Sequence, residues 1–334
     1  MRHQFIDRFS GAVRDERLYG DRLVNLIYSR VRENSPRLFR ALTSMRISDL
    51  LGRVNYDLPL GSRLFGGLRF LERLGVDLGE CLDPPKALNT ARKVFERRIR
   101  YWECRPMPQD PRIVVSPADA KVLVGSLNER WALCLKDKFF TYEELLGRDK
   151  HEWLHAFQGG DYAIFRLTPE KYHYNHTPVA GRVLDFYAID GSFHSCNPGA
   201  VVALATPYSK NRRYVTIIDT DVEDGTRVGL VAMIEIVALM IGEVVQVYSE
   251  LCYDAPQPVQ PGVFLRRGAP KSLYRPGSST DVLLFQRDRV HFDADIVANM
   301  RRQGVASRFT RGFRVPLVET DLAVRSSIGR ARSP

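Results

Sequence analysis

A Gly-Ser-Ser-Thr segment near the C-terminus has the residue types needed for chemistry on the chain itself. It spans residues 277–280 and leads into an apolar, strand-like stretch at residues 282–285. If the hydroxyl of Ser278 attacks the carbonyl of Gly277, the amide rearranges to an ester. Elimination then breaks the chain and leaves a dehydroalanine, and hydrolysis with release of ammonia turns this into a pyruvoyl group, a ketone, in place of Ser278. The same segment is also an ordinary turn signal, so other parts of the chain must give it weight.

Two further segments carry groups that can activate a hydroxyl. Asp119 lies in a Ser-Pro-Ala-Asp turn, and His173 and His176 lie in Tyr-His-Tyr-Asn-His-Thr-Pro, residues 172–178. A carboxylate can orient an imidazole, and the imidazole can take the proton of a hydroxyl. Taken singly, an aspartate in such a turn usually bonds its own backbone, and a histidine is usually an ordinary polar or packed residue. Their combination with the serine segment favours a shared site.

Together these segments resemble the phosphatidylserine decarboxylase proenzyme family. That family carries a Pro-Ala-Asp-Gly turn, a Tyr-His-x-x-His-x-Pro-x-x-Gly segment and a C-terminal Gly-Ser-Thr or Gly-Ser-Ser motif, in this order and at similar spacing. Three other stretches are similar to family segments: Phe-Glu-Arg-Arg-Ile-Arg at 95–100, Phe-Gln-Gly-Gly at 157–160 and Lys-Asn-Arg-Arg at 210–213. The resemblance covers most of the chain between the first of these and the strand after the serines.

The resemblance implies a self-processing, pyruvoyl-dependent decarboxylase that converts phosphatidylserine to phosphatidylethanolamine and carbon dioxide in phospholipid biosynthesis. Cleavage between Gly277 and Ser278 would give a β chain, residues 1–277, and an α chain, residues 278–334. The pyruvoyl group from Ser278 would be the cofactor: a ketone that binds a substrate amine covalently and acts as an electron sink. A pyruvoyl-dependent decarboxylase of another amino acid is the nearest alternative.

The resemblance also assigns roles to individual residues. Asp119 and His176 correspond to the pair that activates Ser278 for self-cleavage. His173 corresponds to the histidine that assists decarboxylation. A neutral imidazole suits both tasks because its pKa lies near the working pH.

The chain departs from the family pattern in ways that affect the choice of serine and substrate. Ala120 replaces the glycine after the aspartate, and a common Lys-Gly-x-Glu-x-Gly-x-Phe pattern becomes Arg-Gly-Ala-Pro-Lys-Ser-Leu-Tyr at residues 267–274. Counting forward from this pattern favours Ser278 as the cleaved residue, whereas counting back from Phe285 favours Ser279. We prefer Ser278 because only it follows a glycine, whose carbonyl is open to attack.

Two other classes of function are weighed against this one. His151 and His155 form a His-Glu-x-x-His pair, a spacing that can bind zinc in a hydrolase. The glycines at 159–160 end that helix almost at once, so we expect no metal site. A basic binding protein is the second alternative, but no aromatic-rich RNA motif or zinc finger accompanies the charge.

The composition indicates a globular protein that meets an anionic surface. Lys and Arg number 49 against 39 Asp and Glu, a formal net charge of +10. Five scattered cysteines are typical of reduced thiols, and the first ten residues lack the apolar core of a signal peptide. The positive charge suits either nucleic acid or acidic phospholipid and does not choose between them. The family resemblance implies phosphatidylserine and an anionic membrane as partners, no nucleic acid, a peripheral place on the cytoplasmic side of the membrane, and a homo-oligomer as an option.

The fold class expected is α+β, with two regions. Residues 1–103 are predicted to be a basic, helical, membrane-associating region, since apolar and basic residues recur at helical spacing in 38–51 and 63–71. Packing of these helices on the core is the alternative. Residues 104–334 are predicted to be a mainly antiparallel β core with one helix at 141–157. Its expected strands include 113–115, 122–124, 162–165, 183–187, 201–204, 214–218 and 244–248.

Overall fold

The computed structural model describes residues 2–18, 21–44, 76–127, 139–204, 206–238, 243–276 and 279–332. Its strands are β1 (Gln4–Asp7), β2 (Val13–Asp15), β3 (Ile113–Val115), β4 (Ala120–Ser126), β5 (Asp161–Leu167), β6 (Tyr174–His176), β7 (Gly181–Ile189), β8 (Arg213–Asp219), β9 (Leu230–Val237), β10 (Val244–Gln246), β11 (Phe264–Leu265), β12 (Pro270–Tyr274), β13 (Ser279–Phe285), β14 (Val290–Phe292), β15 (Thr320–Leu322) and β16 (Ser327–Ala331). Its helices are α1 (Asp21–Leu26), η1 (Ile27–Val31), α2 (Arg32–Asn34), α3 (Pro36–Leu42), η3 (Leu78–Glu80), η4 (Pro85–Ala87), α7 (Ala91–Phe95), α8 (Tyr101–Cys104), α10 (Tyr142–Leu146), α11 (His151–Ala156), α12 (Pro198–Ala203), α13 (Pro207–Lys210), α14 (Ala294–Met300) and α15 (Arg308–Phe313).

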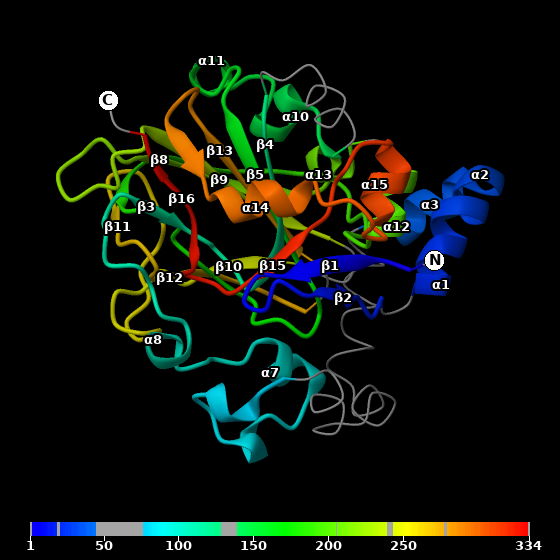
Figure 1. Ribbon diagram of the computed structural model, residues 1–334, viewed down its shortest axis with the longest axis horizontal. Helices are drawn as coiled ribbons and strands as arrows, with labels where there is room; N and C mark the ends of the chain where they lie inside the picture. Colours follow the sequence, from blue (N-terminus) through cyan, green and yellow to red (C-terminus); the bar gives the residue numbers. More distant parts are fainter. Residues whose placement is uncertain are drawn as a thin grey trace.

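One large sheet organises the molecule (Figure 1). It has ten strands in the order β11-β7-β8-β9-β13-β5-β4-β15-β1-β2, and two three-stranded sheets, β10-β12-β6 and β14-β16-β3, accompany it. Among the described strands only β1 and β15 pair in parallel; the other pairings are antiparallel. The prediction of an α+β fold with a mainly antiparallel core is confirmed.

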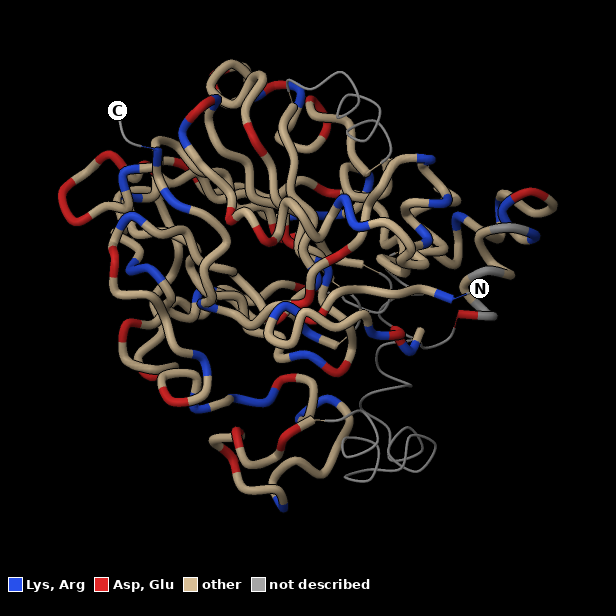
Figure 2. The backbone as a smooth tube through the Cα atoms, in the orientation of Figure 1, with Lys and Arg blue, Asp and Glu red and all other residues tan. Residues whose placement is uncertain are grey.

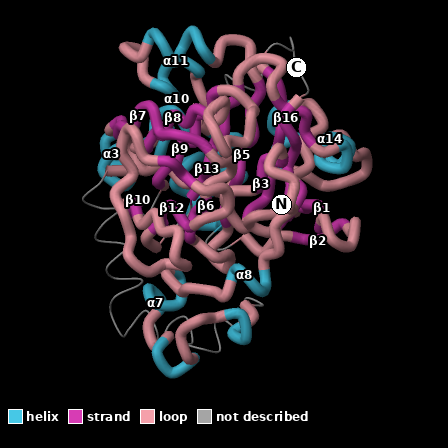
Figure 3. Tube along the Cα trace, turned by 90° about the vertical axis from the view of Figure 1, so that its left-hand side faces the viewer, coloured by secondary structure: helices cyan, strands magenta, loops and turns pink. Residues whose placement is uncertain are grey.

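The large sheet has a different cover on each face. On one face its residues share a hydrophobic cluster with the small sheets, through Val114, Val244 and Tyr274. On the other face they share a cluster with the helices, through Leu145, Tyr208 and Phe309. Figure 3 shows the resulting layers, with α10 and α11 on one side of the large sheet and β10, β12 and β6 on the other. The site described below lies between the large sheet and the sheet β10-β12-β6.

Strand β13 occupies the middle of the large sheet. Its seven residues pair on one side with β5, from Ser279 opposite Leu167 to Phe285 opposite Asp161, and on the other side with β9. A strand buried on both faces reads as a nearly continuous apolar run, which explains Val-Leu-Leu-Phe at 282–285. The strand-like stretch predicted after the serines is therefore confirmed as a strand, and the structure places it in the middle of the large sheet.

The two glycines of the Phe-Gln-Gly-Gly segment have separate structural reasons. Gly159 has a φ of +66°, in the left-handed region that side chains rarely adopt. A Cβ at Gly160 would collide with the backbone carbonyl oxygen of Phe285. Both residues are thus needed where β5 begins beside the end of β13.

The N-terminal region is not wholly helical. Residues 4–7 and 13–15 form β1 and β2 at the edge of the large sheet, so the prediction of a helical segment is wrong for them. Helices α1 to α3 follow, and Phe39 of α3 packs inward against Tyr28. The segments at 45–50 and 51–75, which include most of the two predicted amphipathic stretches, lie outside the described residues. Within the described ranges, none of the helices has the length and apolar character needed to cross a bilayer.

Acidic and basic side chains are interspersed along the described chain and are not separated into two ends (Figure 2). Several lie within the central strands, where charged groups require partners. Glu235, Lys271 and Arg166 are such residues, all buried. These three buried charges therefore need partners, which are described with the site below.

The predicted strands occur as expected except one. Residues 201–204 lie mostly in helix α12, which begins at Pro198 after an Asn197 cap whose side chain accepts a hydrogen bond from Gly199. The predicted helix at 141–157 is two short helices, α10 and α11, because Gly147 between them has a φ of +101°. A short apolar run does not by itself separate a strand from a buried helix.

Candidate active site

The predicted site residues gather around strands β6 and β12. His173 lies directly before β6, and His176 is its last residue. Strand β12 pairs with β6 and ends at Tyr274, whose backbone N–H donates to the carbonyl of His173 over 3.1 Å. The histidine segment and the chain leading to the serines are therefore neighbours in one sheet.

His173 is buried with both of its ring nitrogens unused. Its side chain has no solvent exposure, and neither ring nitrogen makes a hydrogen bond of normal geometry with a described residue, although the backbone of Lys171 is close enough to oppose the lowering of its pKa. The ring stacks on Phe95, with 3.6 Å between the ring centroids. Burial, aided by the nearby Arg97 guanidinium, holds the pKa of His173 well below its usual value, so the imidazole is neutral. A buried polar group without a partner marks a position where a further group fits.

His176 is held on both sides by neighbours. Its Nδ1 lies 2.8 Å from the carbonyl oxygen of Gly268, so Nδ1 carries the hydrogen and donates it. Its Nε2 is then the acceptor for the hydroxyl of Tyr172, 3.0 Å away. Burial lowers the pKa of His176 to about 3. His176 is thus a neutral, oriented imidazole whose Nε2 becomes available only when Tyr172 turns away.

Asp119 is engaged by an arginine and not by a histidine. Arg105 forms a bidentate pair with its two oxygens, at 3.0 and 2.8 Å, and the backbone N–H of Val324 donates to Oδ1 over 2.7 Å. These contacts outweigh burial and keep the pKa of Asp119 below its ordinary value. The negative charge of Asp119 favours the protonated form of both histidines, so it raises their pKa while burial lowers it. Asp119 therefore interacts with His173 and His176 through its charge and not through a direct hydrogen bond.

The predicted cleavage site itself is only partly described. Gly277 and Ser278 lie outside the described residues. Ser279, the alternative, is the first residue of β13, and its hydroxyl is buried without a partner among the described residues. A serine Oγ that is neither solvated nor hydrogen-bonded remains free for a reaction.

The segment at 95–104 reaches the site from outside the sheets. Phe95 covers His173, and the ring of Tyr101 meets His176 edge-on, with the centroids 4.7 Å apart. Arg97 is buried and donates to the backbone carbonyls of Val94 and Glu170. The Phe-Glu-Arg-Arg-Ile-Arg segment, which is similar to a family segment, therefore packs against the site through Phe95.

A buried ion pair ties the strands behind the site together. The ammonium of Lys271 on β12 lies 2.7 Å from Oε2 of Glu235 on β9, and both side chains are fully buried. Glu235 also accepts from Ser272, from Asn175 and from Gln246. The network joins β6, β9, β10 and β12, so it fixes the small sheet against the large one.

A second buried pair spans the two sides of the serine segment. The hydroxyl of Tyr274, the last residue of β12, lies 2.7 Å from Oδ1 of Asp281 on β13 and 3.0 Å from the carbonyl oxygen of Thr280. The backbone N–H of Ile236 donates to the same hydroxyl over 3.0 Å. The two strands that flank the predicted cleavage site are thus joined by one side chain.

An open cleft of about 700 Å³ lies beside Asp119. Arg105, Lys171 and Asp119 line one part of it, and Phe9 and Met107 line another. Lys171 forms an ion pair with Asp321, 2.7 Å away. The cleft therefore combines cationic groups with an apolar rim, as a ligand with a charged head and apolar chains requires.

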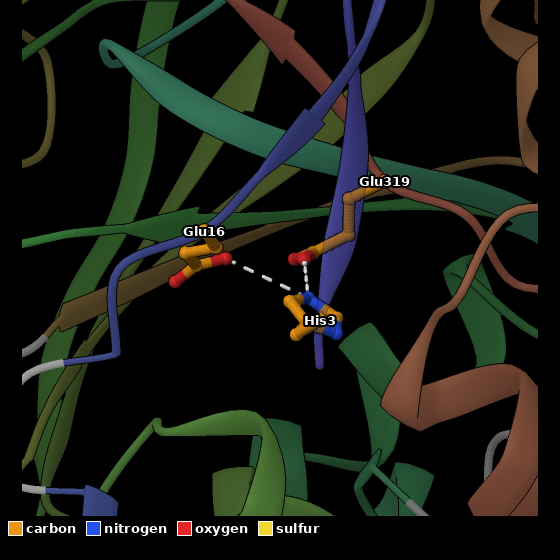
Figure 4. Close-up of side chains that lie close together, drawn as sticks. All are labelled: His3, Glu16 and Glu319. Atoms are coloured by element: carbon orange, nitrogen blue, oxygen red, sulfur yellow. Dashed lines mark hydrogen bonds and ion pairs between the residues drawn. The ribbon is translucent and has the colours of Figure 1, made fainter. Parts of the chain in front are cut away.

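A cluster of His3, Glu16 and Glu319 has the side chains of a metal site but a different role (Figure 4). The backbone N–H of Arg308 donates to Nδ1 of His3, so Nε2 carries the hydrogen and donates to Glu319 over 2.9 Å. Arg166 forms ion pairs with both carboxylates, each over 2.6 Å. With the carboxylates neutralised and the histidine nitrogens occupied, the cluster is a tie that fixes β1 and β2 to the sheet.

The His-Glu-x-x-His pair does not form a metal site in the described chain. His151 and His155 are exposed on α11, a helix of six residues. No third histidine, cysteine or carboxylate within the described residues completes a ligand set with them. The zinc hydrolase alternative has no support from this geometry.

Several site residues were not identified from the sequence. Arg105 and Asp281 lie outside the motifs, and Tyr172 and Tyr274 lie within motif segments but were given no role. The available signal was charge within apolar strands: Glu235 interrupts a long apolar run, and Asp281 precedes Val-Leu-Leu-Phe. Because buried charges need partners, such interruptions indicate a polar network.

Comparison with known proteins assigns the family. Residues 91–309, about two thirds of the chain, match the phosphatidylserine decarboxylase family. The phosphatidylserine decarboxylase proenzyme of Chlamydia trachomatis is 30% identical over 311 residues, covering 92% of this chain and 95% of that protein. The proenzyme of Fusobacterium nucleatum is 26% identical over 301 residues, covering 90% and 93%. Phosphatidylserine decarboxylase proenzyme 2 of Oryza sativa subsp. japonica is 31% identical over 231 residues; the match spans 68% of this chain and only 34% of the rice protein. The chain belongs to the phosphatidylserine decarboxylase family.

Proposed function

We propose that this chain cleaves itself within Gly277-Ser278-Ser279 and uses the resulting pyruvoyl group to convert phosphatidylserine to phosphatidylethanolamine and carbon dioxide. The family assignment supports a carboxy-lyase of this kind. The observation that carries the proposal to these residues is the pair of buried groups without partners, the imidazole of His173 and the hydroxyl of Ser279. They are the groups such a cofactor and its substrate would need.

The described residues fit a pyruvoyl group at the start of β13. When present, the group supplies an electron sink for loss of the substrate carboxylate. The neutral imidazole of His173 has one N–H and one bare nitrogen, so it can hold a proton for the substrate α-carbon. Phe95 and the surrounding sheets exclude water from that imidazole. His173 is therefore our candidate for the residue that assists decarboxylation.

Asp119 and His176 keep the role that the family resemblance implies, activation of the serine, as a prediction. Support comes from their position: the backbone N–H of His176 donates to the carbonyl of Pro117, over 2.7 Å, in the turn that carries Asp119. For His176 to accept a proton, Tyr172 must first release Nε2. A His176→Gln variant keeps the shape and should process slowly or not at all.

The choice of serine has support on each side. Ser278 follows a glycine, whose carbonyl is open to attack. Ser279 has a buried hydroxyl without a hydrogen-bond partner among the described residues. Counting back from Phe285 by the family's spacing also leads to Ser279. Either choice leaves all of β13 in the small chain, whose pairing with β5 and β9 would keep that chain bound after cleavage.

The cleavage experiment decides both the function and the serine. Denaturing electrophoresis of the purified protein should give a large and a small fragment, and mass spectrometry should show a pyruvoyl group at the small fragment's first position. Ser278→Ala or Ser279→Ala should leave one intact band, depending on which serine reacts. The fragment's mass identifies the serine independently, because the two fragments differ by one residue. An intact wild-type chain would refute the proposal.

The substrate follows from paired activity assays. Release of carbon dioxide from phosphatidylserine in vesicles, with little release from free serine, is the expected result. The reverse preference would favour decarboxylation of a free amino acid. His173→Ala should lower the rate strongly while leaving the two fragments in place.

We also place the protein peripherally on an anionic membrane, on its cytoplasmic side. Phe9, at the tip of the β1–β2 hairpin, is fully exposed and lines the same cleft as Asp119. An exposed aromatic residue at the edge of a cleft lined by both cationic and acidic side chains suits insertion at a lipid interface, while the net charge of +10 favours an anionic one. Co-sedimentation should be stronger with vesicles that contain phosphatidylserine than with phosphatidylcholine alone, and Phe9→Ser should weaken it. Equal binding to both vesicle types would contradict this placement.

A further inference from the structure

The Tyr274–Asp281 pair joins the chain on the two sides of the proposed cleavage site. We propose that it is a positioning device for self-cleavage, which fixes both ends of the reacting segment before cleavage and links the two chains afterwards. The inference rests on the proposed function, because it gives these residues a role in the same processing step. Neither residue is among those that the family resemblance assigned.

The contacts of the Tyr274 hydroxyl carry the inference. It lies 2.7 Å from Oδ1 of Asp281 and 3.0 Å from the carbonyl oxygen of Thr280, on the far side of the serines. It also accepts from the backbone N–H of Ile236 in β9. The tyrosine ring has no solvent exposure. One hydroxyl thus connects three strands at the point where β12 ends and β13 begins.

The surroundings of Asp281 hold its carboxyl in the neutral form. It is fully buried, and burial together with the charge of Glu235 on β9 raises its pKa well above the ordinary value, although Tyr274 and Lys271 on β12 oppose the shift. The carboxyl is therefore neutral. Its Oδ2 has no partner among the described residues. Alternation along β13 puts this side chain on the same face as Ser279.

The fixed ends give the pair its effect on the reaction. Attack of a serine Oγ on the preceding carbonyl needs the two atoms in contact, and holding them there converts a rare encounter into a frequent one. Only residues 275–278 separate Tyr274 from Ser279, so a tie between the flanking strands restricts the shape of the segment between them. After cleavage the same hydrogen bond would run between the large chain and the small chain.

The test compares single substitutions in newly synthesised chains. Wild type, Tyr274→Phe, Asp281→Val and Asp281→Asn are translated in a cell-free system, and the intact band is followed with time. Tyr248→Phe is the matched control: its buried ring also carries a bonded hydroxyl, but among the described residues that hydroxyl bonds Glu250, Phe264 and Arg266, none of which lies in β12 or β13. Thermal unfolding is measured for every variant.

We expect Tyr274→Phe and Asp281→Val to slow cleavage about tenfold or more, the size of one buried hydrogen-bonded contact. Asp281→Asn should stay within about threefold of wild type, because the amide is neutral and can accept from the tyrosine. Tyr248→Phe should lower the unfolding midpoint without slowing cleavage. If Tyr274→Phe is cleaved at the wild-type rate, or if Tyr248→Phe slows cleavage as much as Tyr274→Phe does, the inference is wrong and the proposed function still stands. An uncut wild-type chain would overturn the proposed function and the inference with it.

Discussion

Replacing Lys271 by methionine should destabilise the protein more than any exposed charge change. The lysine ammonium and the Glu235 carboxylate lie 2.7 Å apart, and neither side chain is exposed. At an effective dielectric constant of about 20, Coulomb's law gives an attraction of roughly 6 kcal/mol at this separation. Breaking buried pairs costs about 3–5 kcal/mol, because the remaining charge stays buried. Since Asn175, Ser272 and Gln246 still donate to the carboxylate, we expect a loss near the lower limit, about 3 kcal/mol.

Thermal or urea unfolding measures this loss. At about 2 °C per kcal/mol for a large domain, the midpoint of Lys271→Met should fall by roughly 6 °C. The control is Arg148→Met, which breaks an exposed pair with Glu144 and should cost about 0.5 kcal/mol or less. The double variant Glu235→Gln with Lys271→Met should be more stable than Lys271→Met alone, because no unpaired charge remains. The same loss in Lys271→Met and Arg148→Met would refute the reasoning.

Three further predictions concern other parts of the site. Arg105→Met should lower the free energy of unfolding, measured with urea, by about 3 kcal/mol, because it leaves the buried Asp119 carboxylate without its cation. Adding Asp119→Asn to the same chain should recover part of this loss. Gly160→Ala should lower the unfolding midpoint by several degrees, since its Cβ meets the carbonyl oxygen of Phe285. Alanine at Gly304, where a Cβ meets no atom, should lower it less, because a left-handed φ of +77° costs a side chain roughly 1 kcal/mol. The raised pKa of Asp281 means that the folded chain binds more protons than the unfolded chain above about pH 4. This contribution to the free energy of unfolding therefore falls as pH rises, and Asp281→Asn should flatten the slope in unfolding measured from pH 4 to 8.

The sequence predicted elements whose pattern is local. Val-Leu-Leu-Phe at 282–285 identified a buried strand because a strand covered on both faces needs a continuous apolar run. The run at 201–204 was misassigned because a buried helix can show the same short pattern, and Pro198 and Asn197 were the better signals there. Residues 4–7 were misassigned because the strand β15, with which they pair, lies more than 300 residues away, and residues 13–15 form a strand only by pairing with residues 4–6.

The candidate site divides in the same way. The histidine, aspartate and serine segments were found from the sequence because their residue types and order are chemical requirements. Their contacts were not. Asp119 pairs with Arg105, His176 with Tyr172 and Gly268, and His173 with neither acid nor hydroxyl.

By itself, the sequence determined which groups are present for the chemistry and that an apolar strand follows the serines. Only the tertiary structure decided which of those groups are free. Burial in a low-dielectric interior makes the pKa of a histidine and the partners of a carboxylate depend on every strand packed around them. Those strands are distant in sequence, so a linear pattern cannot report them. Even a short separation does not reveal a contact: six residues lie between Tyr274 and Asp281, yet their hydrogen bond exists only because β12 and β13 belong to different sheets that pack together.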